Sequence, residues 1–73
     1  MKHTAKQIGI LVRNTRNRLK ITQKDLALTA GTGLRFIIEL EKGKPTCQLE
    51  KTLTVLQALG IKLALTAPVV KGI

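Results

Sequence analysis

Two short helices joined by a tight turn are predicted between Thr22 and Gly43, and this stretch restricts the possible folds of the chain more than any other. Thr22 is a good N-cap for a helix of eight residues, Gln23 to Ala30, whose apolar positions share one face: Leu26, Ala27 and Ala30. Gly31 follows directly, and because it has no Cβ it can take the left-handed conformation that turns the chain sharply. The stretch therefore begins with one short helix and a defined stop.

A second short helix is predicted from Leu34 to Glu41, with Thr32 or Gly33 as its cap. Ile37 and Leu40 lie one turn apart in it and face inward. Four residues then stand at the spacing that a helix-turn-helix needs, because the helices must cross at a small residue and bend at a glycine: Ala27, Gly31, Ile37 and Leu40. A motif of this kind presents its second helix to the major groove of DNA.

With these residues in place, the segment resembles the Cro and lambda-repressor class of helix-turn-helix domains. Sequences of that class contain T-Q-x-x-L-A, then a turn glycine, then an ending of the form I-x-x-x-E-x-G. The matching residues here are Thr22, Gln23, Leu26, Ala27, Gly31, Ile37, Glu41 and Gly43. The continuation EKGKPT at residues 41–46, with LQALGIKLAL at 56–65, is similar to the HipB antitoxin branch. Together these resemblances span residues 8–66, which is nearly the whole chain.

The resemblance implies a mainly α fold, a lambda-repressor-like helix-turn-helix bundle of four to five helices. It implies a sequence-specific, double-stranded DNA-binding repressor that acts as the antitoxin of a type II toxin–antitoxin system. Such antitoxins repress their own operon and bind a HipA-like Ser/Thr kinase toxin. A free-standing phage-type or housekeeping repressor without a toxin is the alternative, and an adjacent kinase reading frame would decide between them. A cationic peptide for membrane surfaces or RNA fits the charge but not the helix-turn-helix spacing.

The length and charge of the chain agree with a single domain that binds DNA. Its 73 residues are enough for one domain, so residues 1–73 are predicted to form a single helix-turn-helix domain. A domain this small buries only about 60% of its unfolded surface, so we expect a homodimer to supplement its core. Thirteen Lys and Arg against four Asp and Glu give a net charge of +9 and a pI near 10.5. This balance indicates a polyanionic partner, with nucleic acid as the first candidate.

Other partners and activities fit the composition less well. No apolar run approaches the roughly 18 residues of a membrane span and no secretory signal opens the chain, so we expect no membrane and a cytoplasmic protein. One His, one Cys and four acids without clustered spacing supply no metal site and no nucleophile with its base, so we expect no enzyme and no cofactor. His3 and Cys47 are therefore incidental. One Phe without Tyr or Trp disfavours single-stranded nucleic acid, which is bound by aromatic stacking.

The start of the second motif helix is predicted to face DNA, because helix-turn-helix geometry places it in the major groove. Arg35 is the best candidate for reading a base, since a guanidinium can donate two hydrogen bonds to a guanine edge. Leu34 and Ile38 can contact only thymine methyls or sugar carbons. For Arg35, a phosphate contact or a solvated side chain is the alternative. The whole predicted DNA-binding set is Gln23, Lys24, Thr32, Gly33, Leu34, Arg35, Ile38, Glu39, Lys42 and Lys44.

Family resemblance adds three further expectations. At the position of Gln23 the family contacts the DNA backbone and sometimes an outer base. An arginine seven residues before that Gln pairs with a glutamate at the end of the second motif helix, and the matching residues are Arg16 and Glu41. Lys20 stands where the family has glycine at a helix end, so it must adopt a left-handed conformation at some cost in stability.

The rest of the core is predicted to come from two flanking helices. Thr4 and Gln7 form a capping box for a first helix of about 15 residues, whose buried stripe is Ile8, Leu11, Val12, Thr15 and Leu19. Thr46 caps a fourth helix at 47–59, which Gly60 closes and whose inner face is Leu49, Leu53, Leu56 and Leu59, with Val55 beside them. Phe36 is expected to pack at the edge of this core. Residues 1–60 are thus predicted to be a helical core.

Residues 61–66 alternate apolar and polar side chains as a β-strand does. A lone strand leaves its backbone groups without partners, so we expect it to pair antiparallel with the same strand of a second copy. Ile61, Leu63 and Leu65 would then form the dimerisation face and cover the fourth helices. A disordered tail after Gly60 is the alternative. Residues 67–73 form a short tail with no predicted role.

Overall fold

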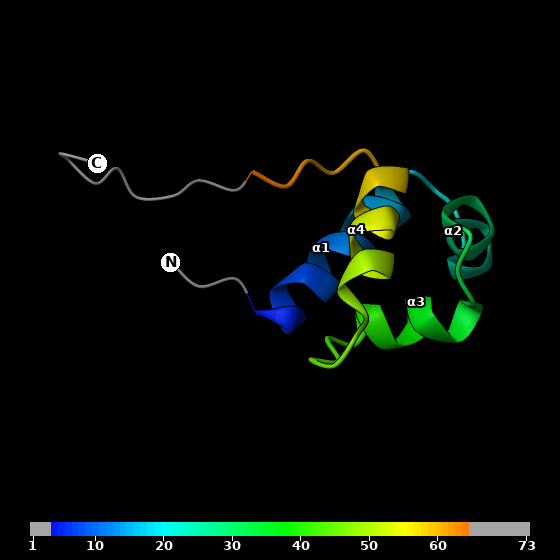
Figure 1. Cartoon of the computed structure of the whole chain (residues 1–73). Helices are drawn as coiled ribbons and strands as arrows, with labels where there is room; N and C mark the ends of the chain where they lie inside the picture. The colour runs from blue at the N-terminus through cyan, green and yellow to red at the C-terminus, as the bar shows by residue number, and fades with distance from the viewer. Residues whose placement is uncertain (1–3, 65–73) are drawn as a thin grey trace, which may run out of the picture.

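The computed structural model describes residues 4–64, and this part of the chain forms four helices in a bundle (Figure 1). In order they are α1 Ala5–Arg18, α2 Gln23–Ala30, α3 Leu34–Glu41 and α4 Leu49–Ala58. α3 packs against both α1 and α2, and α2 also packs against α4. The predicted helix-turn-helix bundle is confirmed, and α2 and α3 are the two helices of its motif.

Capping boxes start the first two helices, as the sequence predicts for α1. The N–H of Gln7 donates to the Thr4 hydroxyl at 3.2 Å, and the N–H of Thr4 donates to the Gln7 side chain at 3.0 Å. Thr22 and Asp25 exchange the same two bonds at the start of α2, at 3.0 and 3.1 Å. Each box satisfies two backbone groups that a helix end leaves unpaired. The beginnings of α1 and α2 are therefore set by local sequence.

Gly31 makes the sharp turn between α2 and α3 in the left-handed conformation, with φ 71° and ψ 31°. The N–H of Thr32 donates to the carbonyl of Ala27 at 2.9 Å and closes the end of α2. Gly33 then serves as the N-cap of α3. Lys20 also has a positive φ, 59°, at the end of α1, so the predicted left-handed lysine is confirmed.

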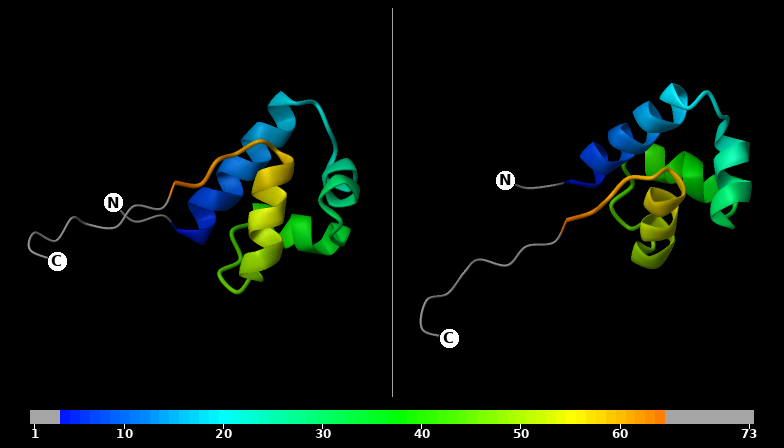
Figure 2. Two further views of the ribbon diagram at one scale, coloured as in Figure 1. Left: turned by 45° about the horizontal axis from the view of Figure 1, so that its top comes forward. Right: turned by 90° about the horizontal axis from the view of Figure 1, so that it is seen from above.

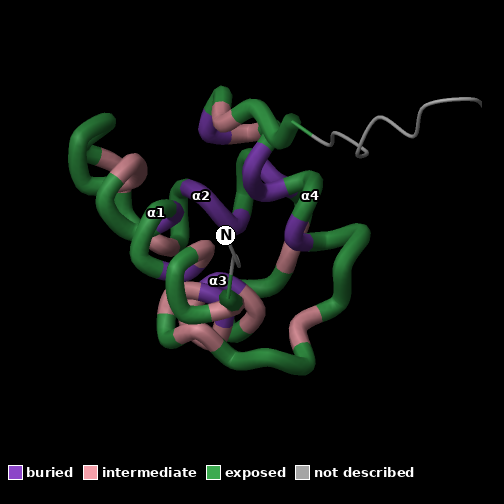
Figure 3. Tube along the Cα trace, turned by 90° about the vertical axis from the view of Figure 1, so that its left-hand side faces the viewer, coloured by how far each residue is buried: buried purple, intermediate pink, exposed green. Residues whose placement is uncertain are grey.

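The core takes one fully buried side chain from each helix: Val12, Leu26, Ile37 and Val55. Around these four pack Ala27, Ala30, Leu40, Leu56 and Leu59. In Figure 3 the buried stretches lie on the inner sides of the helices, where the helices face one another. Phe36 packs against this cluster from α3, and the ammonium of Lys51 on α4 lies 5.9 Å from its ring centroid. The edge-of-core position predicted for Phe36 is confirmed.

The start of α4 differs from the prediction. Thr46 is not its N-cap: the helix begins at Leu49, and its N-cap is Gln48, which makes no capping bond with its side chain. Pro45 and Thr46 lie in a turn instead, so the chain reaches the helix two residues later than the hydroxyl pattern suggests. A threonine before an apolar run is thus an insufficient signal when a proline turn precedes it.

Four leucines predicted to be buried are in fact exposed. Leu11 and Leu19 of the first stripe are 47% and 53% exposed, and Leu49 and Leu53 of the fourth are 70% and 40% exposed. The predicted burial of Val55, Leu56 and Leu59 is confirmed, but Thr52 is buried with them, which places Leu49 and Leu53 at the edge of the core. Thr52 can be buried because its hydroxyl donates to the carbonyl of Gln48 at 2.9 Å.

After α4, residues 61–64 run back toward the N-terminal end of α1 (Figure 2). They form no strand in this single chain. A strand needs a second strand for its hydrogen bonds, so the predicted pairing across a dimer stays a prediction. Leu65, Thr66 and the tail at 67–73 lie outside the described residues.

Candidate DNA interface

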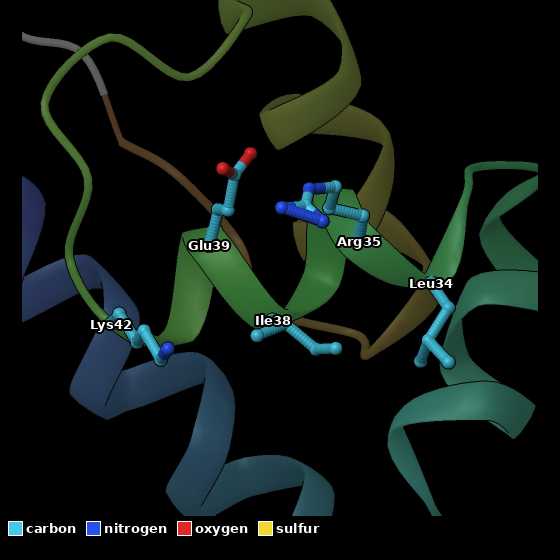
Figure 4. A pocket seen from close by; sticks show the side chains of 5 residues that line it. All are labelled: Leu34, Arg35, Ile38, Glu39 and Lys42. Atoms are coloured by element: carbon cyan, nitrogen blue, oxygen red, sulfur yellow. The ribbon is translucent and has the colours of Figure 1, made fainter.

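The outer face of α3 carries an open depression of about 350 Å³ (Figure 4). Its floor is held in place from behind, because Ile37 and Leu40 of the same helix are buried in the core. Five side chains line it: Leu34, Arg35, Ile38, Glu39 and Lys42. All five belong to the predicted DNA-binding set, so the structure brings the α3 part of that set onto one accessible surface.

Charges of both signs meet on this surface. Arg35 and Glu39 lie one turn apart on the same side of α3, and the Arg35 guanidinium extends toward the Glu39 side chain (Figure 4). Glu39 accepts a hydrogen bond from the ammonium of Lys44 at 3.1 Å, in an ion pair whose side chains are both partly exposed. Lys42 extends from the opposite edge of the depression. The arginine has no such carboxylate partner among the described residues, which leaves its guanidinium donors available.

The other predicted DNA-binding residues lie outside the depression, in α2, in the turn before α3 and, for Lys44, in the loop after α3. Lys24 is exposed on α2, and Gly33 is exposed at the start of α3. The hydroxyl of Thr32 donates to the carbonyl of Gly33 at 3.4 Å. The amide nitrogen of Gln23 donates one of its two hydrogens to Glu41 at 3.1 Å, so its second N–H can donate to another partner.

Arg16 and Glu41 join α1 to the end of α3. The Arg16 guanidinium contacts the carboxylate at 2.7 and 3.1 Å and also donates to the carbonyl of Ile21 at 2.8 Å. This hydrogen bonding with Glu41 raises the pKa of Arg16 above its ordinary value. Glu41 thereby connects three helices, because Gln23 of α2 binds the same carboxylate. The network therefore holds the end of α3 against α1 and the start of α2.

Gly9 is a positioning residue that the sequence analysis missed. A Cβ at this position would lie 2.5 Å from the carbonyl oxygen of Leu40 and 2.9 Å from that of Glu41. α1 therefore crosses the end of α3 at a distance that only glycine permits. The available signal was a glycine inside an amphipathic helix pattern, where it costs helix stability and usually has a packing reason.

A second surface lies between α1, α4 and the segment after α4. It is an apolar groove of about 150 Å³ lined by Ile8, Leu11, Leu49, Thr52, Leu53, Leu56, Ile61 and Leu63. Most of the leucines that the sequence analysis wrongly placed in the core line this groove. Of the predicted dimerisation residues, Ile61 and Leu63 belong to it, while Leu65 lies outside the described residues.

The remaining chemistry of the described residues is sparse. Residues 4–64 contain no group of three or more His, Cys, Asp or Glu that could hold a metal ion. Burial raises the pKa of the Cys47 thiol above its ordinary value. None of the helices described is long and apolar enough to cross a membrane.

Comparison with known proteins places these features in a family. Residues 9–64 match a family model described as a helix-turn-helix domain. The chain is 51% identical over 65 residues to the uncharacterised HTH-type transcriptional regulator y4mF of Sinorhizobium fredii, covering 89% of this chain and 86% of that protein. Two HipB complexes, with 20mers designated O2 and O4, have the same fold with a TM-score of 0.81 at 21% identity. The matches cover 92% of this chain and 93% and 94% of those chains. The chain therefore belongs to the helix-turn-helix domain family of DNA-binding transcriptional regulators.

Proposed function

We propose that this protein is a dimeric, sequence-specific repressor of transcription and a HipB-like antitoxin. In this role it binds its own operator in double-stranded DNA and also binds a HipA-like Ser/Thr kinase toxin in the cytoplasm. The single observation that carries the proposal is the exposed face of α3, which a helix-turn-helix presents to the major groove. Its function would come from binding surfaces within one domain, residues 1–73, and would need no catalytic site and no cofactor.

The side chains on α3 suit base recognition. Arg35 can donate two hydrogen bonds to a guanine, and Leu34 and Ile38 offer apolar contacts to thymine methyls. Leu34 is 44% exposed although it is a large apolar residue at the start of a helix. Its side chain is therefore accessible for such a contact. The proposed base-contacting set is Leu34, Arg35, Ile38 and Glu39, with Gly33 allowing close approach of the helix start.

Lysines around α3 suit the phosphate backbone. Lys24 at the start of α2, and Lys42 and Lys44 at the end of α3, are all exposed. They flank the base-contacting face from both ends of the motif. With Gln23 and Thr32 they form the proposed backbone-contacting set. A net charge of +9 supports this assignment, because release of counterions from phosphates supplies most non-specific affinity for DNA.

The apolar groove supports the dimer. Contiguous exposed apolar surface is typical of an interface with another chain, and four exposed leucines line this groove: Leu11, Leu49, Leu53 and Leu63. Residues 61–64 already lie along this groove, so the same segment of a second copy can pair with them under two-fold symmetry. Ile61 and Leu63, with Leu65 continuing the alternation, would face the groove. A dimer would also present two α3 helices to half-sites about 34–36 Å, or a multiple of that distance, apart.

The antitoxin role rests on the similarity to HipB, whose complexes share the fold of this chain. A free-standing phage-type or housekeeping repressor would have the same α3 surface and the same dimer. The two roles differ only in the presence of a kinase partner. The test is to co-express this gene with an adjacent kinase gene. The antitoxin role requires the two proteins to purify as one complex. Separate elution of the two proteins would favour the free-standing repressor.

Electrophoretic mobility shift with the DNA upstream of its own gene tests the repressor. We expect binding to a palindrome in that DNA at concentrations at least about 1,000-fold below those needed for random duplex of equal length. Equal binding to both duplexes would contradict the proposal. That result would favour a cationic peptide that binds any polyanion.

A further inference from the structure

Glu39 is an acid on a surface that should attract DNA. The chain has four acidic residues, and the other three have a use elsewhere in the fold. Asp25 completes the capping box of α2, and Glu41 binds Arg16. Glu50 lies in the first turn of α4, where the helix dipole favours a negative charge. Glu39 alone lines the depression on the outer face of α3.

Lys44 forms an ion pair with this carboxylate. The Glu39 side chain is 35% exposed, and its Oε2 accepts from the Lys44 ammonium at 3.1 Å. The backbone N–H of Lys44 also donates to the carbonyl of Glu39 at 3.1 Å, which holds the loop against the helix end. The lysine thus offsets part of the negative charge of this carboxylate. Arg35, one turn earlier, lies beside it on the same surface.

A carboxylate in this place repels phosphates and the acceptor atoms of guanine. It can be favourable on DNA only where a base amino group donates to it, and in the major groove cytosine N4 is the donor that matches Glu. Resting on the proposed DNA-binding function, we propose that Glu39 determines specificity by accepting a hydrogen bond from a cytosine amino group. It would admit cytosine at one position of each half-site and discriminate against other bases by about 5- to 150-fold.

The test compares base preferences of wild type and Glu39→Gln, selected from a random duplex library so that no operator needs to be known. Glutamine has the same shape but pairs with adenine N6 and N7 instead. We expect one cytosine position to lose its preference and to accept adenine, while all other positions keep theirs. Binding to random duplex should become stronger, because one repulsive charge is removed.

Glu50→Gln is the matched control, since it removes the same charge from an exposed residue of α4, outside the depression. It should leave every base preference unchanged. Thermal unfolding of both variants checks that they fold.

If Glu39 served only to hold Lys44 and its loop, Glu39→Gln would lower the melting temperature and leave the selected sequence identical to that of wild type. That result would overturn the inference while leaving the repressor intact. If the wild-type protein selected no preferred sequence from the library, the proposed function would be overturned and, with it, the role of Glu39.

Discussion

Arg16 and Glu41 are joined by two hydrogen bonds, from Nε at 2.7 Å and from Nη2 at 3.1 Å, between side chains only 11% and 4% exposed. The residues are 25 positions apart in sequence and belong to α1 and α3. Arg16 also donates to the carbonyl of Ile21, so its guanidinium binds the segment between α1 and α2 as well. This partly buried pair therefore helps to hold the motif against α1, beside the apolar core that α1 and α3 share.

Replacing Glu41 with alanine should destabilise the fold severely. The change strands the Arg16 guanidinium in a nearly buried site, and breaking a buried pair costs about 3–5 kcal/mol. In a domain of this size the melting temperature should fall by more than about 10 °C. Circular dichroism on heating measures it, and a melting temperature within a degree of wild type would contradict the role assigned to the pair.

A double variant separates the pair's net contribution from the cost of stranding one charge. Arg16→Met with Glu41→Leu leaves no unpaired charge, and such apolar replacements are often neutral in stability. We expect this variant to melt higher than Glu41→Ala. It should still bind DNA more weakly than wild type, because Gln23 loses the carboxylate that orients its side chain.

Much of this architecture could be predicted because local signals set it. The capping residues Thr4 and Thr22 and the turn glycine Gly31 act through bonds with neighbours in sequence, so each signal is complete within a few residues. The spacing of the motif then brings the α3 residues onto one face. Family resemblance added the Arg16–Glu41 pair, which no periodicity could indicate.

What could not be predicted depends on surfaces that form only in three dimensions. Leu11 and Leu53 continue the apolar stripes of their helices, but a stripe does not reveal whether its edge meets the core or a groove. The crossing at Gly9 is set by the approach of a distant backbone, at residues 40 and 41. The carboxylate of Glu39 acquires its partner only because the loop folds back to place Lys44 beside it.

Replacing Gly9 with alanine should also destabilise the protein, although alanine is the better helix former. The added Cβ would meet two backbone carbonyl oxygens, which cannot rotate away as a flexible side chain can. Overpacking of this kind costs about 1–3 kcal/mol, against roughly 1 kcal/mol gained in helix propensity. Asn14→Ala on the exposed side of α1 is the control and should change stability by less than about 0.5 kcal/mol. Urea unfolding compares them, and a Gly9→Ala protein more stable than wild type would show that α1 can shift freely.

Arg35→Ala should weaken binding to the operator far more than binding to random duplex. The loss of a bidentate contact with guanine is expected to cost about 1–3 kcal/mol on the operator alone. Fluorescence anisotropy with both duplexes at one salt concentration measures the two losses. Equal losses would make Arg35 a phosphate contact.

Lys24→Ala, unlike Arg35→Ala, should weaken binding to all duplexes equally. Lys24 is exposed at the start of α2, outside the depression that α3 presents to bases, so we expect it to contact phosphate. Its removal should weaken operator and random duplex alike and reduce the log–log salt slope by about one unit. Lys44→Ala should behave similarly on salt titration. A slope unchanged from wild type would remove either lysine from the backbone-contacting set.

Dimerisation can be tested with two neighbouring residues of α1 that are almost equally exposed, Leu11 at 47% and Ile10 at 49%. Leu11 and Leu63 both line the apolar groove, whereas Ile10 does not. Leu11→Asp places a charge where the second copy should pack, so the dimer should weaken by at least about 10-fold and operator affinity should fall with it. Ile10→Asp adds the same charge to the same helix and should leave the dimer intact.

Deleting residues 61–73 should act like Leu11→Asp, because it removes the segment expected to pair. Sedimentation velocity distinguishes these outcomes, and a tight dimer in all three variants would mean that neither the groove nor the C-terminal segment forms the interface.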